Sequence, residues 1–385
     1  MLKRVSIQNF KSLKDVTLDL QRVNLLIGPN NSGKSNFLKA LEFFESREFR
    51  SYDLAELERV SYKHQRNSIK YAFDFKSKIK SSLEGQINSQ PETFYRLLFD
   101  KQIVIENFEA QVVHKAVPAI IDENGNTISV EDSIIDRIEP EFRNYLSPKI
   151  YKPDPNKLNK PGPVGTGEEV VNADASNLVG FLDLMLVKYR RTAFQQIEND
   201  LQKCIPEFDE IKLDDVKPAE EIRRLYAEDG NKYSFRRLGL RDGRQDITYW
   251  ADELSEGTLY FLALLCIINQ PNPPKLLLLE EPEKGIHPRR IKEVIQFILL
   301  LVEEKDIQVI MTTHSPVVLD MFADMPESVF IFDKDEEGAT HVKNLQRDVI
   351  EPDTAKSTEL GLEPPHYTDA LGDSWTVGFL GGVPK

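Results

Sequence analysis

Cysteine is almost absent from this sequence. Cys204 and Cys266 are the two that occur among 385 residues, far apart and each in an apolar or helical setting. A disulfide framework needs several cysteines, and a zinc site needs Cys and His clustered at short spacing. We therefore expect two reduced thiols and a fold that depends on neither disulfides nor structural zinc.

Long apolar runs are absent as well. The two longest, YFLALLCII and FILLLV, fall well short of the roughly 20 residues that span a bilayer. The opening stretch MLKRVSIQNF alternates apolar and polar residues, which predicts a strand and not a signal peptide. These features predict a soluble, cytoplasmic protein without a membrane partner.

Positive charge is in deficit. The 49 Lys and Arg residues are outnumbered by 63 Asp and Glu, which gives a net charge of −14. This balance argues against a generally basic surface that coats nucleic acid, although it leaves a local basic groove open. Hydrophobic residues make up 40% and charged residues 29%, as in ordinary globular proteins. A chain of 385 residues is too long for one simple core, so we expect two lobes or one domain with a large insertion.

A glycine-rich loop follows an early apolar run, in the segment LLIGPNNSGKSNFLKAL. Gly28, Gly33 and the pair Lys34–Ser35 match the pattern G-x-x-x-x-G-K-[ST], in which backbone N–H groups surround phosphate oxygens. The flanking pattern predicts a strand before the loop and a helix after it. A coincidental turn is the alternative, and this context disfavours it. The residues assigned to phosphate binding are Gly28, Asn30, Asn31, Ser32, Gly33, Lys34, Ser35 and Asn36.

Two adjacent glutamates follow a second buried strand, in KLLLLEEPEKGIHP. Glu280 and Glu281 would lie at the carboxyl end of this strand, the edge at which open α/β sheets bind ligands. Glu280 would help to hold Mg²⁺ together with the Ser35 hydroxyl, and Glu281 would orient and polarise the water that attacks the γ-phosphate of ATP. The alternative is that both carboxylates merely end a strand in solvent.

Two further segments place polar residues where an anion could bind. LSEGT precedes a helix that is apolar almost all round and must therefore be buried. Ser255 is either a plain N-cap of this helix, which the local sequence favours, or part of an anion site at its N-terminus. His314 ends a strand in IQVIMTTHS, where its imidazole could hydrogen-bond the γ-phosphate. A lone histidine is usually structural, and its place one strand after the glutamate pair favours the functional interpretation.

In chain order, GPNNSGKS, LSEGT, LLLLEEPEKGIHP and TTHS resemble the Walker A, signature, Walker B with D-loop, and H-switch segments of an ABC-type ATPase. The opening VSIQNFKSLKDVTLDL is similar to the RecF, SMC and OLD-like branch. DASNLVGFLDLM and CIPEFDEIKLDD resemble stand-alone ATPases of the AAA_21 type. The resemblance implies an α/β P-loop fold, in which an ABC-type head with a mixed β-sheet flanked by helices carries an inserted α+β and helical lobe.

The resemblance also implies a mechanism with ATP and Mg²⁺. Two copies of the chain would enclose two ATP molecules in a homodimer, the signature of one copy completing the site of the other. Hydrolysis at Glu281 and His314 would loosen the dimer and drive a conformational switch. Lys11 and Ser12 lie near the nucleotide in similar proteins. The residues carried over are Leu254, Ser255, Glu256, Gly257 and Thr258 for the signature, and Glu283, Lys284, Gly285, Ile286 and His287 for the D-loop.

The expected domain boundaries divide the ATPase core along the chain. Residues 1–68 and 250–348 would form it, residues 69–249 would form the inserted lobe, and residues 349–385 a tail. Within the lobe, 69–75 and 102–130 are predicted strands with DENGN as a hairpin turn, 153–167 an exposed Pro- and Gly-rich connector, and 176–203 helices. These helices are too short for the coiled-coil arm of an SMC protein.

Arginines in the lobe offer a track for DNA phosphates, but the net charge favours pairing with acids on a solvated surface. They are Arg190, Arg191, Arg223, Arg224, Arg236, Arg237, Arg241 and Arg244. Asp333 and Asp335 in FIFDKDEEG resemble half of a Toprim nuclease site. Because relatives with that nuclease carry a whole extra domain, we interpret both as a strand end and turn.

The sequence leaves three biological roles open. One is a DNA-linked motor or sensor in repair, and another is the ATPase subunit of an anti-phage defence pair with a separate effector protein. The third is an ATP-gated docking module that hydrolyses little and regulates a nuclease or toxin. The Gly-rich, aromatic tail LGDSWTVGFLGGVPK is a candidate docking segment.

Overall fold

The computed structural model describes residues 1–43, 59–64, 69–77, 93–106, 109–121, 127–129, 145, 148–165, 168–217, 234–284, 286–365 and 367–382. The chain forms two compact units. Unit 1 comprises Met1–Ile150, Lys275–Glu281 and Asp306–Lys385, and unit 2 comprises Tyr151–Pro274 and Pro282–Lys305. None of the helices described is both long and apolar enough to cross a membrane.

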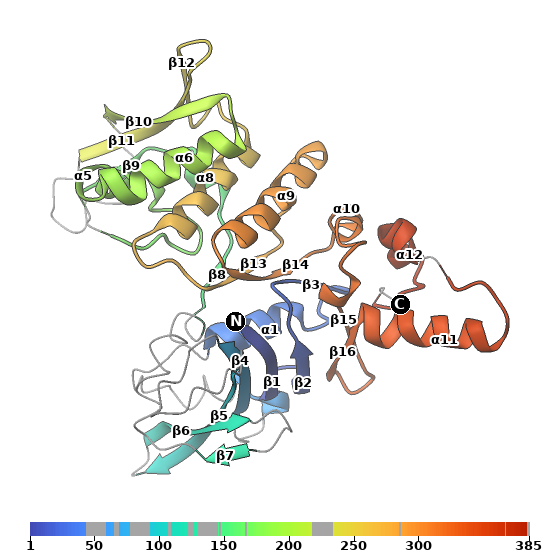
Figure 1. Cartoon of the computed structure of the whole chain (residues 1–385). Helices are drawn as coiled ribbons and strands as arrows, with labels where there is room; N and C mark the ends of the chain where they lie inside the picture. Colours follow the sequence, from blue (N-terminus) through green and yellow to red (C-terminus); the bar gives the residue numbers. More distant parts are fainter. Residues whose placement is uncertain are drawn as a thin grey trace, which may run out of the picture. The chain divides into compact units, whose positions relative to one another are not determined.

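The central sheet of unit 1 has the strand order β16-β15-β3-β14-β13-β8 (Figure 1). Its parallel strands β3 (Val23–Ile27), β13 (Leu276–Glu280) and β14 (Gln308–Thr312) are almost wholly buried, as expected for continuous apolar runs covered on both faces. The sheet is completed by β15 (Val329–Lys334), parallel to β3, by β16 (Thr340–Asn344), antiparallel to β15, and by β8 (Ile150–Tyr151). The carboxyl ends of β3, β13 and β14 therefore meet at one edge, as predicted.

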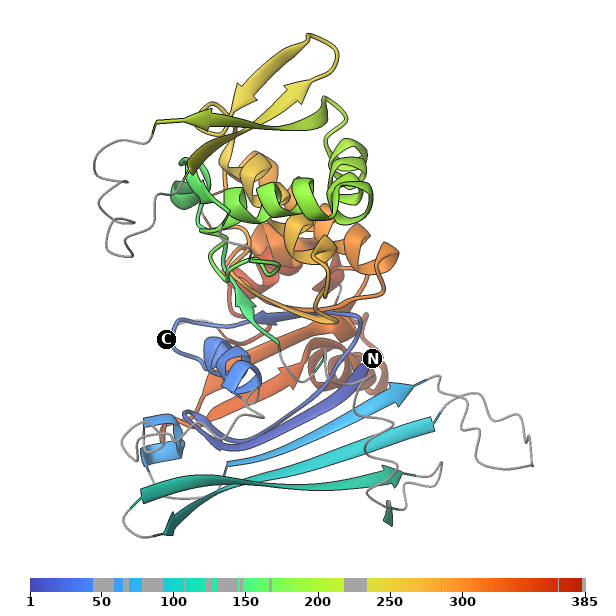
Figure 2. The same cartoon turned by 90° about the vertical axis from the view of Figure 1, so that its left-hand side faces the viewer.

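A second, antiparallel sheet of unit 1 has the order β2-β1-β4-β5-β6-β7 (Figure 2). Its strands are β1 (Leu2–Phe10), β2 (Leu13–Asp19), β4 (Ile69–Ser77), β5 (Thr93–Glu106), β6 (Glu109–Ile121) and β7 (Thr127–Ser129). Val5 and Ile7 of β1 are buried and face the core, while Ser6 between them is only half-buried, which is the alternation expected of a sheet with one covered face. The predicted turn DENGN lies outside the described residues.

Helix α1 (Lys34–Phe43) begins directly after the glycine-rich loop. Phe37 and Leu38 are fully buried in the same core cluster as Val5 of β1 and Leu26 of β3, so the helix joins the two sheets of unit 1. The Phe37 and Phe332 rings meet edge to face with centroids 6.1 Å apart. The remaining elements of this unit are η1 (Tyr62–His64), α10 (Pro316–Asp320), η3 (Pro326–Ser328), η4 (Gln346–Ile350), α11 (Glu351–Glu359), η5 (Tyr367–Ala370) and α12 (Leu371–Thr376).

Unit 2 packs helices against a small antiparallel sheet. The sheet contains β10 (Phe208–Val216), β11 (Ser234–Asp242), β12 (Ile247–Trp250) and β9 (Gly162–Val164). The helices are α4 (Pro155–Leu158), α5 (Leu178–Lys188), η2 (Arg190–Phe194), α6 (Gln195–Cys204), α8 (Glu256–Asn269) and α9 (Pro288–Glu304). All residues of α8 from Gly257 to Ile268 are buried, which confirms the prediction made from its apolar composition.

The structure divides the chain differently from the sequence analysis. Residues 69–150, expected in the inserted lobe, belong to unit 1 because β4 pairs with β1 and thereby extends the N-terminal sheet. The predicted exposed connector at 153–167 contains short helical and strand elements in its described part, and only some of its residues are exposed. That stretch contains α4, capped by the Asp154 side chain, and β9, which pairs with β11, and Leu158 and Gly162 are buried.

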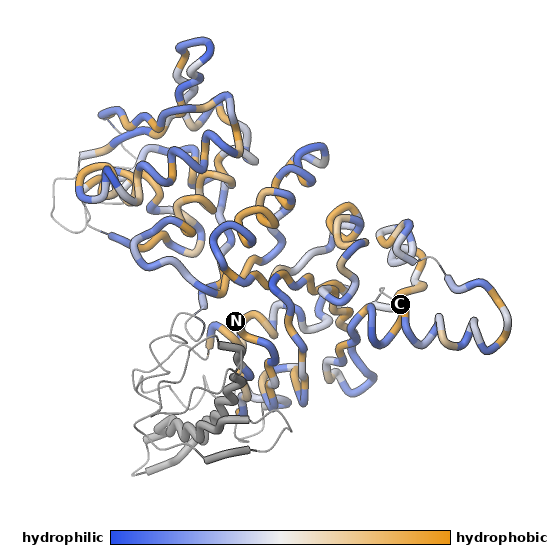
Figure 3. Tube along the Cα trace, in the orientation of Figure 1, coloured by the Kyte–Doolittle hydropathy of each residue, from blue (hydrophilic) through white to orange (hydrophobic). Residues whose placement is uncertain are grey.

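The C-terminal segment folds back onto unit 1. Helix α12 packs against α10, and the backbone N–H of Gly372 donates to Asp320 Oδ1 at 2.7 Å. The indole of Trp375 donates to the Gly382 carbonyl at 3.3 Å, and a Cβ built on Gly382 would lie 3.5 Å from the Cα of Gly28. By contrast α11, which is mainly hydrophilic, has no buried residue (Figure 3). The end of the tail is therefore held against the glycine-rich loop.

Candidate nucleotide-binding site

The cradle loop, residues 28–33, connects β3 to α1 in a conformation that requires glycine. Gly28 and Gly33 have φ values of 141° and 113°, which L side chains rarely adopt. A Cβ on Gly28 would lie 2.2 Å from the Phe332 carbonyl oxygen. Asn31 also has a positive φ of 66°, a conformation that asparagine tolerates better than most residues. The spacing of the two glycines thus reflects both backbone conformation and close packing.

Lys34 is held inside the loop. Its Nζ donates to the carbonyl oxygens of Gly28 at 2.7 Å and Pro29 at 2.9 Å, and the residue is 5% exposed. Burial lowers the pKa of Lys34 to about 8, against the opposing effect of the nearby carboxylates of Glu281 and Glu280. An ammonium group with so little solvent around it is well placed to gain from a bound anion.

Ser35 and Glu280 meet at the edge of the sheet. The Ser35 hydroxyl, in the first turn of α1, donates to Glu280 Oε1 at 2.6 Å from the end of β13. A hydroxyl and a carboxylate are hard oxygen ligands of the kind that Mg²⁺ prefers, usually beside substrate phosphates. The pair therefore fits the predicted metal site, and these two residues would hold the ion.

Glu281 follows in an unusual backbone conformation, with φ of 50°. Its N–H donates to both the carbonyl oxygen and the hydroxyl of Thr312, each at 3.2 Å. Its Oε1 lies 3.6 Å from His314 Nε2, and both side chains are partly exposed. Strained residues of this kind persist where surrounding contacts hold them, and they cluster at active sites. The structure brings the predicted base and the predicted histidine together.

Ser32 supplies an independent sign that the loop fits an anion. Its residue is 2% exposed, and its hydroxyl is one of the buried polar groups in the described structure that make no hydrogen bond. A buried hydroxyl without a partner normally costs free energy, so such groups in native proteins call for an explanation. A phosphate oxygen in the cradle loop would give Ser32 its partner. Asn30 is exposed, and Asn36 binds Ser12 through its side-chain amide at 2.8 Å.

The predicted signature and D-loop belong to unit 2, whereas the cradle loop belongs to unit 1. Ser255 caps α8, because its hydroxyl accepts the N–H of Thr258 at 3.1 Å, while its signature role toward a second copy stays a prediction. Leu254 and Glu256 are half-buried beside it. A Cβ on Gly257 would come within 4.0 Å of Ile286, so signature and D-loop adjoin within unit 2. In the D-loop, Glu283 is half-buried, Lys284 is exposed, His287 caps α9, and Gly285 lies outside the described residues.

The comparison with protein families decides the chain's membership. The model of AAA_21, described as "AAA domain, putative AbiEii toxin, Type IV TA system", matches residues 23–320. That range includes β3, the cradle loop, Glu280, Glu281 and His314. The chain belongs to the AAA_21 family. An AAA_21 protein is a P-loop ATPase, so the geometry above lies in a domain of the type that binds nucleotides.

Two curated proteins are similar to this AAA_21 chain over most of its length. The OLD nuclease of Thermus scotoductus is 21% identical over 333 residues, which cover 83% of this chain and 60% of the nuclease. The ATP/GTP phosphatase of Helicobacter pylori is 21% identical over 350 residues, or 83% of this chain and 87% of the phosphatase. The chain thus spans about 60% of the length of the nuclease that it matches.

Two solved structures are also similar. The SMC head domain of Thermotoga maritima has 14% identity and a TM-score of 0.43, covering 89% of this chain and 98% of that one. The Smc head of Pyrococcus furiosus, bound to the C-terminal domain of ScpA, has 14% identity and a TM-score of 0.46, covering 94% and 99%. At these scores the family membership rests on the sequence match.

Three of the six arginines of the predicted DNA track that the structure describes are ion-paired within unit 2, and the other three, Arg190, Arg191 and Arg244, are exposed. Arg236 binds Asp183 and Asp215, Arg237 binds Asp214, and Arg241 binds Asp209 and Glu210. The guanidinium of Arg237 also stacks on Trp250, 3.6 Å from the ring centroid. Arg223 and Arg224 lie outside the described residues. Neutralised guanidinium groups on this sheet favour the ion-pair interpretation over a phosphate track.

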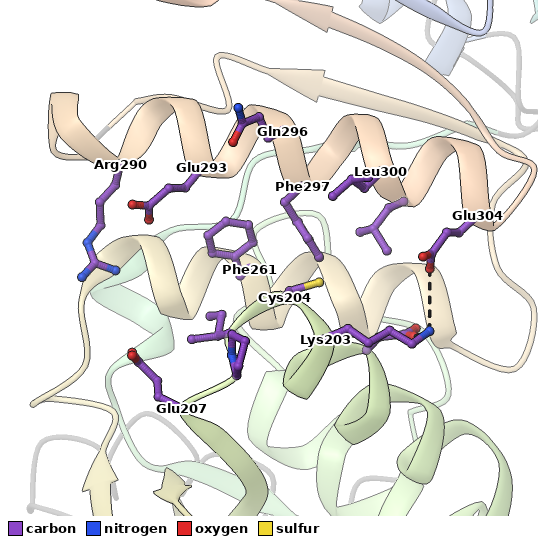
Figure 4. Close-up of a pocket in the computed structure, with 14 residues that line it drawn as sticks. Lys203, Cys204, Glu207, Phe261, Arg290, Glu293, Gln296, Phe297, Leu300 and Glu304 are labelled. Carbon is purple, nitrogen blue, oxygen red and sulfur yellow. Dashed lines mark hydrogen bonds and ion pairs between the residues drawn. The ribbon is translucent and has the colours of Figure 1, made fainter. Parts of the chain in front are cut away.

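A hollow of about 510 Å³ lies within unit 2 of the AAA_21 chain. Figure 4 shows the side chains of α9 and α8 around it, with Phe261 and Phe297 close together and Arg290 and Glu293 further along α9. The two phenylalanine rings meet edge to face with centroids 4.6 Å apart. Leu300 is 58% exposed at this hollow. Acidic side chains outnumber Lys203 and Arg290 in its lining, which does not favour a phosphate.

Three contacts of the nucleotide site were not found from the sequence. Thr312 fixes the backbone of Glu281, and the Phe332 carbonyl and Thr340 side chain closely approach Gly28 and Gly33. The two glycines of the loop indicate that another segment of the backbone or a side chain approaches it closely, but they do not identify that segment.

Asp333 and Asp335, which resemble half of a nuclease site, lie at the end of β15 and in the following turn, where Asp335 pairs with His341 at 2.9 Å.

Proposed function

We propose that this chain binds ATP in the cradle loop, hydrolyses it with Glu281 as the base, and uses the cycle to switch between open and closed homodimers. The observation that carries the proposal is the meeting of Lys34, the Ser35–Glu280 pair and the Glu281–His314 pair at one edge of one sheet. Each has the chemistry that phosphoryl transfer needs, which is mainly positioning and charge stabilisation.

The roles follow from the contacts. Lys34 exchanges its two carbonyl partners for the β- and γ-phosphate oxygens, and the free Ser32 hydroxyl donates to a phosphate. Mg²⁺, when held by Ser35 and Glu280, supplies positive charge to the phosphates. Glu281 takes the proton of a water whose oxygen bonds to the γ-phosphorus as the bond to the ADP oxygen breaks. His314 donates to the γ-phosphate beside it.

Closure of a homodimer would bring the signature of one copy onto the ATP of the other. The N-terminus of α8, a buried helix of 14 residues, offers backbone N–H groups to an anion there.

The closed homodimer is tested by measuring the molar mass of Glu281→Gln in solution with ATP and with ADP, beside Lys34→Met. We expect a dimer only for Glu281→Gln with ATP. A monomer under all conditions would contradict the closed state.

A defence role is the more specific form of the proposal. The family description names a toxin and a Type IV toxin–antitoxin system, and one relative is an OLD nuclease. The ion pairs of Arg236, Arg237 and Arg241 weigh against a DNA-linked motor. Turnover should therefore be the same with and without double-stranded DNA. A rate raised about tenfold or more by DNA would instead favour the DNA-linked role in repair.

An ATP-gated docking module is the second candidate, because several large apolar side chains of the C-terminal segment of unit 1 are exposed. Leu360, Leu362, Val377 and Phe379 are 63%, 62%, 67% and 73% exposed. Large exposed apolar groups are typical of partner-binding surfaces. Slow ATP turnover that changes when a separate effector protein is added would favour this module. Turnover unaffected by any such effector would disfavour it.

The pKa of Lys34 predicts how ATP binding depends on pH. Because burial lowers this pKa to about 8, the ammonium is charged below that value and increasingly neutral above it. We expect the association constant for ATP to fall by up to about tenfold per pH unit above this value. Calorimetric titration between about pH 7 and 9.5 measures it. Lys34→Arg, charged throughout, should show a flat profile, and a flat wild-type profile would contradict the assignment.

A further inference from the structure

A chain of buried hydroxyl groups lies under the cradle loop. The Asn36 side-chain amide donates to Ser12 Oγ at 2.8 Å, and Ser12 Oγ lies 2.8 Å from Thr340 Oγ1. The Thr340 hydroxyl in turn donates to the Ser32 carbonyl oxygen at 2.9 Å. Ser12 is 9% exposed and Thr340 is 2% exposed, so the chain is shielded from water. It joins residues that are 308 positions apart in the sequence.

The direction of these bonds is fixed by the last acceptor. A carbonyl oxygen can only accept, so the single hydrogen of the Thr340 hydroxyl is committed to Ser32. Ser12 must then donate to Thr340, and the Ser12 oxygen accepts from Asn36. Each group therefore donates to the next in one direction, from Asn36 in α1 to Ser12, then to Thr340, and finally to the Ser32 carbonyl in the loop before the helix. Bonds arranged in such a chain polarise one another.

The last hydrogen bond of this series, from Thr340 to the Ser32 carbonyl, acts on a peptide group of the cradle loop. The Ser32 carbonyl and the Gly33 N–H belong to the same planar trans peptide, and they point in opposite directions. A hydroxyl on β16 that holds the Ser32 carbonyl therefore also holds the Gly33 N–H in the opposite direction, away from β16. Backbone N–H groups of this loop are the groups that contact phosphate in P-loop proteins.

Strand β16 approaches the loop closely enough to exert this control. A Cβ on Gly33 would lie 2.2 Å from Thr340 Oγ1 and 2.9 Å from its methyl carbon. The Thr340 N–H also donates to the Ser12 carbonyl at 2.8 Å, which fixes the strand in place. On the same hairpin, Lys334 Nζ donates to Asn31 Oδ1 at 3.1 Å. The hairpin thus contacts the loop at both Asn31 and Gly33.

We propose that Thr340, supported by Ser12, is a positioning residue that aims the Gly33 N–H at the nucleotide phosphates. The proposal rests on the proposed function, because it requires that the cradle loop binds phosphate. Thr340 acts through the loop backbone and touches no substrate. The loop would then be set from the C-terminal part of the chain, beyond the range 23–320 that the family model matches.

The test compares variants that differ by one hydroxyl. Thr340→Val keeps the shape and leaves both the Ser12 hydroxyl and the Ser32 carbonyl without their partner, whereas Thr340→Ser keeps the hydroxyl. We expect Thr340→Val to bind ATP about tenfold more weakly, as for loss of a buried hydrogen-bond partner, and Thr340→Ser to stay within about twofold. Inorganic triphosphate, which has only phosphates to offer, should lose affinity by the same factor.

The control is Thr17→Val, which breaks the exposed Ser6–Thr17 hydroxyl pair, 2.8 Å long, between β1 and β2. Thermal unfolding of each variant is recorded alongside, and Ser12→Ala replaces Thr340→Val should the latter not fold. Wild-type and Thr340→Val affinities that agree for both ligands would overturn the positioning role while leaving the proposed function intact. A wild-type protein that binds neither ligand would overturn the proposed function itself.

Discussion

Replacement of Glu281 by Gln is expected to lower the rate of ATP hydrolysis by about 10²- to 10⁴-fold while ATP still binds. The amide keeps the size of the side chain and its place beside His314, but it cannot accept the proton of the attacking water. The backbone at Glu281, with φ of 50° and its N–H on Thr312, does not depend on the carboxylate. Phosphate release under saturating ATP measures the rate, and labelled ATP in equilibrium dialysis measures binding.

The matched control for this change is Glu336→Gln, which makes the same substitution at an exposed position of the β15–β16 hairpin in the same unit. It should hydrolyse ATP at the wild-type rate. Full activity in Glu281→Gln would show that another group takes the proton, and the role assigned to Glu281 would be withdrawn. A loss of ATP binding in this variant would instead mean that the carboxylate serves the fold of the site.

Replacement of Lys34 by Met is expected to weaken ATP binding by at least about 100-fold, because charge-assisted bonds to phosphate are lost from a nearly dry site. Stability should change little. The lowered pKa of Lys34 shows that burial disfavours its charge, so removing that charge offsets the loss of its bonds to Gly28 and Pro29. ATP titration followed by thermal unfolding of the same sample measures both quantities.

Lys356→Met serves as the control for this prediction, since Lys356 is an exposed residue of α11 in the same unit. Its ATP affinity and thermal unfolding should equal those of the wild type. If Lys34→Met bound ATP as the wild type does, the cradle loop would not be the nucleotide site. If it unfolded far below the wild type, Lys34 would have a structural role that its burial does not suggest.

Local features of the sequence were enough to predict the parallel strands and the glycine-rich loop. β3, β13 and β14 are short continuous apolar runs, and runs of this length are typical of buried parallel strands. Because the carboxyl ends of neighbouring parallel strands lie at one edge of a sheet, the residues that follow β3, β13 and β14 are expected to lie close together at that edge. The predictions that place Glu281 and His314 each at the γ-phosphate follow from this rule, and in the structure the two side chains lie 3.6 Å apart.

Contacts between distant segments could not be predicted in this way. Thr340 reaches Ser32 across 308 positions, and nothing in either local sequence encodes that pairing. The division into units was missed for the same reason, because β4 joins β1 by long-range pairing and not by a composition shift. Prolines and glycines usually signal a loop, but in the predicted connector Pro155 begins α4 and Gly162 packs against Val179.

The most direct test of the account is phosphate release from ATP by the purified wild-type chain, measured beside Lys34→Met with and without Mg²⁺. We expect release over many turnovers by the wild type with Mg²⁺, and none above background for Lys34→Met or after chelation of the metal. Release by Lys34→Met at the wild-type rate would contradict the central claim that the cradle loop at the end of β3 is the ATPase site.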